Sequence, residues 1–448
     1  MRWRGLWPLH RTPHTYSLGI TTMKLGLLAA SVTLGLAGFA ASGSSVAAPA
    51  ADRFLDVIVT LNSGNGHSRA DNRAMAAEVA RQHGVAASHT YGKVLTGFSA
   101  RVSEAALDRL RADPMVANIE FDREMHTTMG KPGSGGGGGA AQVTPWGVSR
   151  VGANTNSNDG AGIHIYIIDT GIDSDHPDLA AHIGNGFAAV NCKGRTCNQS
   201  WDDDNGHGSH VAGSAAAIDN STGVVGIAPG ATLHAIKVLS SQGSGSTSGI
   251  IAGIDWMTAE VSARGQAAVA NMSLGGTGSK TGTCTSSGFT GTDTFHQAIC
   301  NAKNAGVVFA VAAGNDGADA EASTPAAYDD AVITVSATQQ GDNWPTWSNW
   351  GDGNPGGLTL PVVIAAPGVN ILSTWNNGGT NTISGTSMAS PHVAGAAALY
   401  LKSHPQAANG SAFSNTLNGL LGASESTASF SNTSGHPHEE SFLRAGTL

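Results

Sequence analysis

Charged residues are scarce in this chain, and basic residues are scarcer than acidic ones. Only 12% of the 448 residues are charged, with 23 lysines and arginines against 32 aspartates and glutamates, a formal net charge of −9. No segment is rich in lysine or arginine, so we expect neither nucleic acid nor an anionic membrane as a partner. Glycine, in contrast, is abundant at 61 residues. Low charge with many small residues is typical of a compact, loop-rich, exported protein rather than a disordered one.

Long apolar runs are also missing, with one exception near the N-terminus. A basic residue follows Met23, and apolar residues then extend from Leu25 to Ala40 before a zone of small residues. This order predicts a secretory signal over residues 1–48, with Met23 as an alternative start. A membrane anchor is the alternative, but the apolar run is shorter than the roughly 20 residues that a span needs. We therefore expect a secreted protein with no membrane segment after signal removal.

Cysteine is rare as well, with four residues in the chain. In an exported protein, four cysteines favour disulfides over free thiols, and they allow three pairings. We expect the pairing between sequence neighbours. A zinc site is the alternative, but no second close cysteine pair or correctly spaced histidine pair completes one. The expected disulfides join Cys192 to Cys197 and Cys284 to Cys300.

A glycine-rich segment divides the chain in two. Before it, residues 54–126 alternate strand and helix patterns in the order β-α-β-α-β, which predicts a small α+β domain with an antiparallel sheet backed by two helices. Residues 127–141 include the run "GKPGSGGGGGAA", which cannot form a core and predicts a linker. Residues 142–448 then form the second domain.

The second domain has short strands that are apolar on both faces and alternate with helices. Such strands predict an α/β fold, in which a mostly parallel sheet is flanked by helices on both faces. Ligands of such sheets bind at the carboxyl ends of the strands. The residues directly after each strand are therefore the ones to inspect. The strand segments are "IHIYIID", "LHAIKVL", "AAVANMSL", "GVVFAVAAG" and "AVITVSA".

Residues with catalytic chemistry occur at these strand ends and at two helix starts. Asp169 ends the first strand, Asn315 follows the strand "GVVFAVAAG", and His207 and Ser387 each open a helix rich in small residues. A serine hydroxyl becomes a good nucleophile when a neutral imidazole takes its proton and a carboxylate fixes the tautomer of that imidazole. An aspartic protease would need a second D-T-G motif, and the α/β-hydrolase order would need an acid and a histidine after the serine. In this chain there is one D-T-G motif and the order is Asp169, His207, Ser387, so neither alternative fits.

Five stretches of the second domain resemble the signature motifs of subtilisin-like serine proteases (subtilases). They are "DTGIDSDHPDL", "NGHGSHVAG", "NMSLGG", "AAGNDG" and "GTSMASPHVAG", in the order that the family has. The first domain, with "YGKVLTGFSARV" and "LRADPMVANIEFD", resembles the inhibitory propeptide of the same family. The resemblance implies a secreted serine endopeptidase that cuts proteins or peptides. It also implies a zymogen whose own propeptide acts as chaperone and inhibitor before autocatalytic removal.

The resemblance also implies a role for individual residues. Ser387 matches the nucleophile, His207 the general base, Asp169 the carboxylate that orients it, and Asn315 the side-chain donor to the oxyanion. Two further segments match those that bind a substrate as an extended strand, and two glycines match the S1 pocket. These substrate-binding positions are Gly243, Ser244, Gly245, Ser273, Leu274, Gly275 and Gly314.

A further match implies a structural calcium ion and no organic cofactor. The segment "IDNSTGV" resembles the family's calcium loop, and an all-oxygen ligand set suits Ca²⁺. Backbone carbonyls would come from Ile218, Thr222 and Val224, and side-chain oxygens from Asn220, Asp178 and Gln142.

Several features depart from the family or leave alternatives open. The base lies in H-G-S-H where H-G-T-H is commoner, and the glycine run leaves the mature N-terminus open between His126 and Ala141. One rival is a metallohydrolase that uses His207, His210 and residues 202–204, although H-x-x-H is not the i, i+4 spacing of H-E-x-x-H. The other rival is an inactive binding protein with the same fold. We expect a monomer and solvated histidines at 436 and 438. The carboxylates at 202–204 are expected in solvent, with a weak second cation site there as the alternative.

Overall fold

The computed structural model describes residues 53–62, 66–128, 141–351 and 361–448. The expected signal segment and most of the expected linker lie outside these ranges. Within them, no helix is long and apolar enough to cross a bilayer. The helices are α1 (Arg69–Gln82), α2 (Glu104–Arg111), α3 (Trp146–Val151), α4 (His207–Ala216), α5 (Thr247–Arg264), α6 (Thr294–Asn304), α7 (Thr386–Ser403) and α8 (Ser411–Ala423).

The N-terminal domain has an antiparallel sheet with two helices on it, as the sequence predicts. Its strand order is β2-β3-β1-β4, and α1 and α2 begin at the side chains of Ser68 and Ser103, which accept backbone N–H groups of the first turn. The apolar face of each helix packs on the sheet around Val59, Phe98 and Leu110. The strands are β1 (Phe54–Leu61), β2 (Ala87–Tyr91), β3 (Gly97–Ser103) and β4 (Val116–Phe121).

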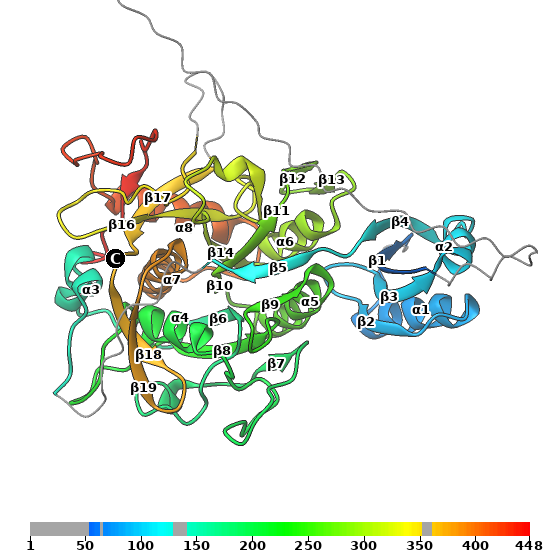
Figure 1. Ribbon diagram of the computed structural model, residues 1–448, viewed down its shortest axis with the longest axis horizontal. Helices are drawn as coiled ribbons and strands as arrows, with labels where there is room; N and C mark the ends of the chain where they lie inside the picture. Colours follow the sequence, from blue (N-terminus) through cyan, green and yellow to red (C-terminus); the bar gives the residue numbers. More distant parts are fainter. Residues whose placement is uncertain (1–52, 63–65, 129–140, 352–360) are drawn as a thin grey trace, which may run out of the picture. The chain divides into compact units, whose positions relative to one another are not determined.

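A parallel eight-stranded sheet forms the centre of the second domain (Figure 1), which confirms the predicted α/β fold. Its order is β20-β17-β16-β14-β10-β6-β8-β7, so β6 lies between β10 and β8, two strands from later in the chain. The strands are β6 (His164–Asp169), β7 (Phe187–Ala188), β8 (Thr232–Lys237), β10 (Ala268–Met272), β14 (Val307–Ala312), β16 (Ile333–Thr338), β17 (Val362–Pro367) and β20 (Ser441–Phe442).

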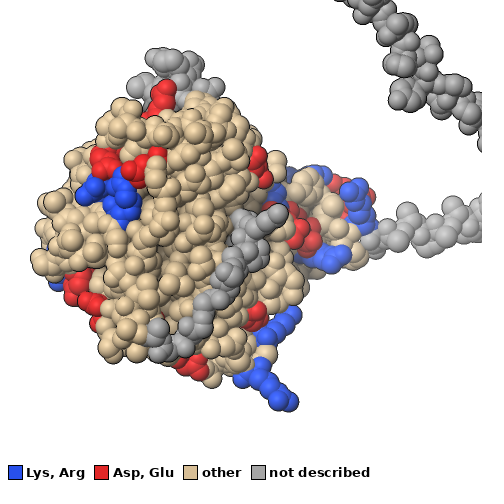
Figure 2. Space-filling model, turned by 60° about the vertical axis from the view of Figure 1, so that its left-hand side comes forward, with Lys and Arg blue, Asp and Glu red and all other residues tan. Residues whose placement is uncertain are grey.

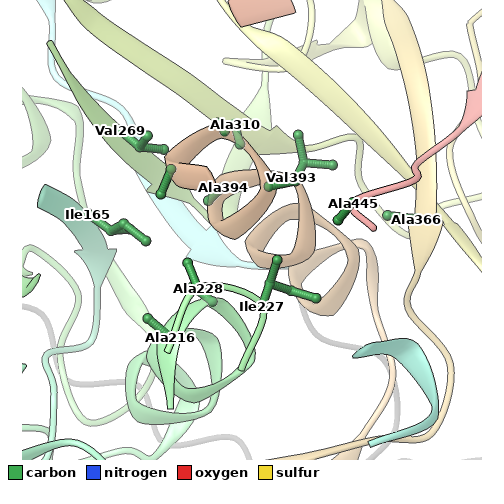
Figure 3. Close-up of a cluster of buried hydrophobic side chains, with 14 of the residues drawn as sticks. Ile165, Ala216, Ile227, Ala228, Val269, Ala310, Ala366, Val393, Ala394 and Ala445 are labelled. Carbon is green, nitrogen blue, oxygen red and sulfur yellow. The ribbon is translucent and has the colours of Figure 1, made fainter. Parts of the chain in front are cut away.

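The sheet is buried on both faces because alternate side chains enter two separate cores. Ile165 and Ile167 of β6 pack with α3, α4, α7 and α8, whereas Tyr166 and Ile168 pack with α5 and α6. In Figure 3 the small residues of α4 and α7, such as Ala216 and Ala394, lie against the sheet residues Ile165, Val269 and Ala310. Small residues let these helices approach the sheet closely, and this close packing fixes the N-terminal ends of α4 and α7.

Shorter strands lie outside the central sheet. They are β5 (Glu124–Thr127), β9 (Ser244–Ser246), β11 (Leu274–Thr277), β12 (Thr283–Thr285), β13 (Gly288–Thr290), β15 (Ser323–Thr324), β18 (Ile371–Trp375) and β19 (Gly379–Ile383). The two expected disulfides are present: Cys192–Cys197 lies in the loop between β7 and α4, and Cys284–Cys300 joins β12 to α6. The face shown in Figure 2 is mostly uncharged, with acidic and basic side chains in small separate groups.

The C-terminal segment differs from the expectation of a solvated tail. His438 is buried, and its Nδ1–H donates to the carboxylate of Glu440 at 2.9 Å. Its ring stacks on Trp344, whose indole N–H also donates to Glu440. His436 is half-buried and stacks on Trp350. The expectation of solvated histidines is therefore wrong, because β20 joins the edge of the central sheet and carries the buried Glu440 with it.

The C-terminal segment should contribute strongly to stability. Phe442 is fully buried, contacts the ring of Phe430, and lies under the guanidinium of Arg150. Truncating a buried phenylalanine costs about 3–5 kcal/mol through lost burial and the cavity left behind. We predict a loss of this size for Phe442→Ala in urea unfolding, and a loss of about 1 kcal/mol or less for Leu421→Ala on the exposed side of α8. Equal losses would contradict the docking of this segment.

Candidate active site

The structure brings Asp169 and His207 together in a fully buried contact. Asp169 ends β6, His207 is the first residue of α4, and the carboxylate Oδ1 lies 2.7 Å from the imidazole Nδ1. Both side chains are 0% exposed. An ionised carboxylate only accepts hydrogen bonds, so Nδ1 carries the proton and Nε2 of the neutral ring has its lone pair free. Nε2 has no hydrogen-bond partner among the described residues.

Ser387 lies at the start of α7, and its hydroxyl contacts a carbonyl from the N-terminal domain. Ser387 Oγ donates to the carbonyl oxygen of Thr128, and it also lies 3.2 Å from the carbonyl oxygen of Ser273. The side chain of Thr128 adds a contact of 2.6 Å to the same hydroxyl. The serine hydroxyl is therefore turned toward the peptide segment that occupies the cleft, and no hydrogen bond joins it to His207.

Asn315 holds the same carbonyl oxygen from the other side. Its Nδ2 donates to the carbonyl oxygen of Thr128 at 2.6 Å, while its Oδ1 accepts from the backbone N–H and the hydroxyl of Thr386 at 2.9 Å each. The backbone N–H of Thr386 can only donate, which fixes the amide with its oxygen toward α7 and its nitrogen toward the cleft. The amide is thus oriented in advance to donate to a carbonyl oxygen or an oxyanion at this point.

The expected substrate-binding segments surround an extended strand that ends at Thr128. Strand β5 lies between β9 and β11 and pairs with both in antiparallel fashion (Figure 1). Met125 pairs with Gly245, His126 with Ser244 and with Gly275, and Thr127 with Leu274. The N–H groups of Thr127 and Thr128 donate to the carbonyls of Gly243 and Ser273. Residues 127 and 128, which the sequence placed in the linker, thus lie in the cleft.

A cavity opens beside the carbonyl of Thr128. Its volume is about 460 Å³, and Gly275, Gly314, Ala312 and Ala326 line it together with Thr128. Gly314 has φ +110°, and a Cβ there would lie 2.3 Å from the amide of Asn349, so a larger residue does not fit. Both glycines expected to line the S1 pocket border this cavity, and a Cβ on Gly275 would lie 3.7 Å from the Thr128 side chain.

The two histidines of "NGHGSH" do not form a pair. His210 is fully buried on the next turn of α4, and its Nε2–H donates to the carbonyls of Ile371 and Asn381 at 3.0 and 3.2 Å. Burial lowers its pKa to about 3, so the ring stays neutral. Within the described residues, no group of three or more histidine, cysteine or acidic side chains converges as metal ligands. The different partners of His207 and His210 give no support to the metallohydrolase alternative.

The carboxylates at 202–204 are not the solvated loop residues that the sequence suggested. Asp202 and Asp203 are 2% and 5% exposed, and the carboxylate of Asp204 pairs with the buried Lys237 at 2.6 Å. That expectation is wrong because these carboxylates accept backbone N–H groups of their own and neighbouring loops, which a charge pattern does not reveal.

The residues expected to bind calcium lie together around one loop. Asp178 accepts from the Asn220 amide at 3.0 Å and from the Val224 N–H at 2.9 Å, and the Gln142 amide lies 3.1 Å from the Ile218 carbonyl. Residues 141 and 143 pair with Thr222 and Val224 on the same loop. The Asn220 Oδ1 accepts the Thr222 N–H at 2.7 Å, which fixes that amide, whereas a 180° turn of the Gln142 amide would direct its oxygen toward the loop. The donor set fits a cation that prefers oxygen ligands.

Comparison with known proteins agrees with the site geometry. Residues 160–435 match the model of the subtilase family, and residues 56–128 match the model of peptidase inhibitor I9. An extracellular serine proteinase of Thermus sp. (strain Rt41A) is 40% identical over 345 residues, which cover 75% of this chain and 73% of that protein. The chain belongs to the subtilase family. It is therefore a hydrolase of the serine protease type, with an inhibitor I9 propeptide domain.

Other subtilases support the same assignment. Subtilisin E of Bacillus subtilis (strain 168) is 36% identical over 319 residues, covering 70% of this chain and 72% of that protein. The crystal structure of a cold adapted subtilisin-like serine proteinase covers 67% of this chain and 97% of its own, with 34% identity and a TM-score of 0.54. The family and the fold expected from the sequence are thus confirmed.

The subtilase domain holds its propeptide through a buried carboxylate. Asp255 on α5 is 1% exposed, and its Oδ1 accepts the backbone N–H groups of Gly92, Lys93 and Val94 at 3.0, 2.5 and 3.0 Å. Its Oδ2 accepts from the guanidinium of Arg69 at 2.9 and 3.0 Å. Charge-assisted bonds of this kind are roughly twice as strong as neutral ones. One side chain of the protease domain therefore accepts three consecutive N–H groups of a propeptide loop.

The propeptide in turn supplies carboxylates to two helices of the subtilase domain. Asp122 accepts from the N–H and hydroxyl of Ser248 at the start of α5, and Glu120 accepts from the Thr294 N–H at the start of α6. Helix N-termini present unpaired N–H groups and a positive dipole end, so acidic side chains there are favourable. Each of the two domains thus supplies carboxylates that accept hydrogen bonds from the other.

Truncating Asp255 should weaken the binding of the propeptide to the protease domain. Removing one partner of a buried, charged hydrogen-bond network costs about 2–5 kcal/mol, because three N–H groups and Arg69 lose their acceptor. We predict that Asp255→Ala makes peptidase activity appear at least about 30-fold faster after the precursor is cut. Glu260→Gln on the same helix, which contacts Asn185 and Arg264 and not the propeptide, is the matched control. The contact would have no role in retention if both variants released activity at the wild-type rate.

Proposed function

We propose that this subtilase is a secreted endopeptidase made as a zymogen, and that it matures by cutting its own chain between Thr128 and Met129. One observation carries the proposal. The Thr128 carbonyl oxygen accepts from both Ser387 and Asn315 while the residues before it pair with β9 and β11. A peptide substrate would bind in the same way, by adding a strand between two edges.

The first half of the reaction forms an acyl-enzyme. The Ser387 O–H first turns from the Thr128 carbonyl oxygen to His207 Nε2, the free lone pair of a ring held by Asp169. Ser387 Oγ then attacks the carbonyl carbon of Thr128 as its proton moves to Nε2. The carbonyl oxygen becomes an oxyanion, which the Asn315 amide and the backbone N–H of Ser387 stabilise. The C–N bond then breaks, and His207 returns the proton to the amine of Met129. Thr128 remains bound to Ser387 as an ester.

The second half restores the enzyme. Water gives a proton to His207 and attacks the ester carbon, the oxyanion forms in the same place, and the Ser387 oxygen leaves with the proton from His207. Protein and peptide substrates would follow the same two steps once the propeptide has left the cleft. The name of the Thermus relative, an extracellular proteinase, supports secretion of this chain.

The cleavage site gives the most direct test of this proposal. Wild-type precursor should yield a mature chain that begins at Met129, and Ser387→Ala precursor should stay uncut for lack of the nucleophile. Intact-mass spectrometry and N-terminal sequencing measure both. Maturation of the Ser387→Ala variant would refute the serine mechanism, and a different first cut in the wild type would refute Thr128 as the acyl residue.

Calcium is proposed as a structural ion rather than a catalytic one. Asp178, Asn220, Gln142 and the carbonyls of the 218–224 loop would hold it, and it would tie the start of the protease domain to that loop. Gly223 favours this arrangement, since it has φ +65° and a Cβ there would lie 1.9 Å from the Asp178 carboxylate. Residues 141–143 already contact the loop while Thr128 lies at Ser387, so binding does not require prior cleavage.

Calcium should therefore stabilise the uncut precursor. An ion at 100 times its Kd adds about 2.7 kcal/mol to the free energy of unfolding. We predict that Ca²⁺ raises the Tm of Ser387→Ala precursor by several degrees relative to EDTA, and that Asp178→Asn removes most of this rise. An unchanged Tm in the parent variant would contradict the calcium proposal, whatever the peptidase activity.

A further inference from the structure

Asp203 lies between the two segments that carry Asp169 and His207. Its carboxylate is 5% exposed and accepts five hydrogen bonds. Oδ1 accepts the hydroxyl of Thr170 at 2.9 Å, directly after Asp169 in the chain. Oδ2 accepts the N–H and hydroxyl of Ser209, in the first turn of α4, at 2.9 and 2.6 Å. One side chain thus connects the end of β6 to the start of α4.

The start of α4 depends on such outside partners because its own N-cap residue has no side chain. Gly206 has φ +113°, and a Cβ there would lie 2.2 Å from the ring of Trp375, so a capping serine or aspartate cannot replace it. Asp203 accepts the Gly206 N–H at 2.9 Å, and the Thr170 hydroxyl accepts the Gly208 N–H at 2.9 Å. These groups satisfy N–H donors that a helix start otherwise leaves unpaired.

The hydroxyl in the unusual H-G-S-H sequence completes this network. Ser209 Oγ donates to Asp203 and accepts the N–H of Asp173 at 3.0 Å, which ties the loop after β6 to α4 a second time. Thr170 N–H donates to Asp169 Oδ1 at 2.7 Å, the oxygen that also holds the imidazole. A shift of Thr170 or of the first turn of α4 would therefore change the Asp169–His207 contact.

We infer that Asp203 is a positioning residue, which sets the distance and direction between Asp169 and His207 without touching the substrate. The inference rests on the proposed Asp-His-Ser mechanism. It assigns to Asp203 an effect on the chemical step, since small errors in placing catalytic groups are costly in rate. Substrate binding should be unchanged, because the five hydrogen bonds of this carboxylate go to residues 170, 205, 206 and 209, and none goes to β9, β11 or the cavity beside Gly314.

The test compares Asp203→Asn with Asp202→Asn in mature enzyme, after tagged wild-type enzyme has removed the propeptide and has itself been withdrawn. Asp202 is the matched control because it is equally buried, and it accepts N–H groups of Ser174 and Gln199 but none from α4. We expect kcat of Asp203→Asn to fall by about 10²-fold with KM within about threefold of wild type. Asp202→Asn should change both by less than about threefold.

A spectroscopic readout separates positioning from general destabilisation. The low-field proton NMR signal of His207 Nδ1–H reports its hydrogen bond to Asp169, and it should shift or broaden in Asp203→Asn while Asp202→Asn keeps it. If Asp203→Asn does not fold, Thr170→Val takes its place, because it removes the hydroxyl that links Asp203 to Gly208 and should lower kcat by about tenfold.

Three outcomes would overturn the inference: equal kcat in the two asparagine variants, a KM increase in Asp203→Asn that accounts for its loss of kcat/KM, or an unchanged Nδ1–H signal. Ser387→Ala distinguishes this failure from failure of the proposed function. An active Ser387→Ala enzyme would refute the serine mechanism itself, whereas an inactive one beside a fully active Asp203→Asn would refute only the role of Asp203.

Discussion

The hydrogen bond between Asp169 and His207 is the contact on which the rest of the site depends. It joins two fully buried side chains at 2.7 Å, and water is excluded from both. In such surroundings the carboxylate strongly favours the tautomer with a proton on Nδ1, which leaves Nε2 as a base. The parallel sheet places Asp169 at a strand end, and the close packing of α4 on that sheet brings His207 to it.

The contact between the propeptide and the protease domain combines charged hydrogen bonds with apolar packing, in which Tyr91, Val94 and Leu95 join the core cluster of α5 and α6. Asp255 accepts from a propeptide loop, and Asp122 and Glu120 accept from helix starts of the protease domain. The strand from Glu124 to Thr127 then continues into the cleft and ends with the Thr128 carbonyl between Ser387 and Asn315. The contacts that bind the propeptide and those that place Thr128 at the active site are thus joined by one continuous strand.

Much of the fold and of the chemistry follows from local sequence patterns. Strands apolar on both faces predict a covered parallel sheet, and Asp169, Asn315, His207 and Ser387 stand at the strand ends and helix starts where such a sheet places its ligands. The structure places Asn315 and Ser387 on one carbonyl oxygen, and Asp169 against His207. Both disulfides join cysteines that are close in sequence, which is why the simplest pairing was correct.

The features that escaped prediction depend on partners far away in the chain. Strand β2, "ASHTY", has no apolar alternation, and β5 forms only because β9 and β11 supply its hydrogen bonds. The sequence predicts that Asp203 and His438 lie in solvent, yet Asp203 accepts a hydrogen bond from Thr170 and His438 pairs with the buried Glu440. Tertiary hydrogen bonds of this kind leave no periodic signal.

Labelling of the matured protein with a fluorophosphonate, followed by peptide mapping, tests the central claim most directly. The account predicts one adduct, on Ser387, with activity lost in proportion to labelling and no labelling in a His207→Ala variant. An enzyme that keeps its activity with Ser387 fully modified, or that loses activity through an adduct on another residue, would contradict it.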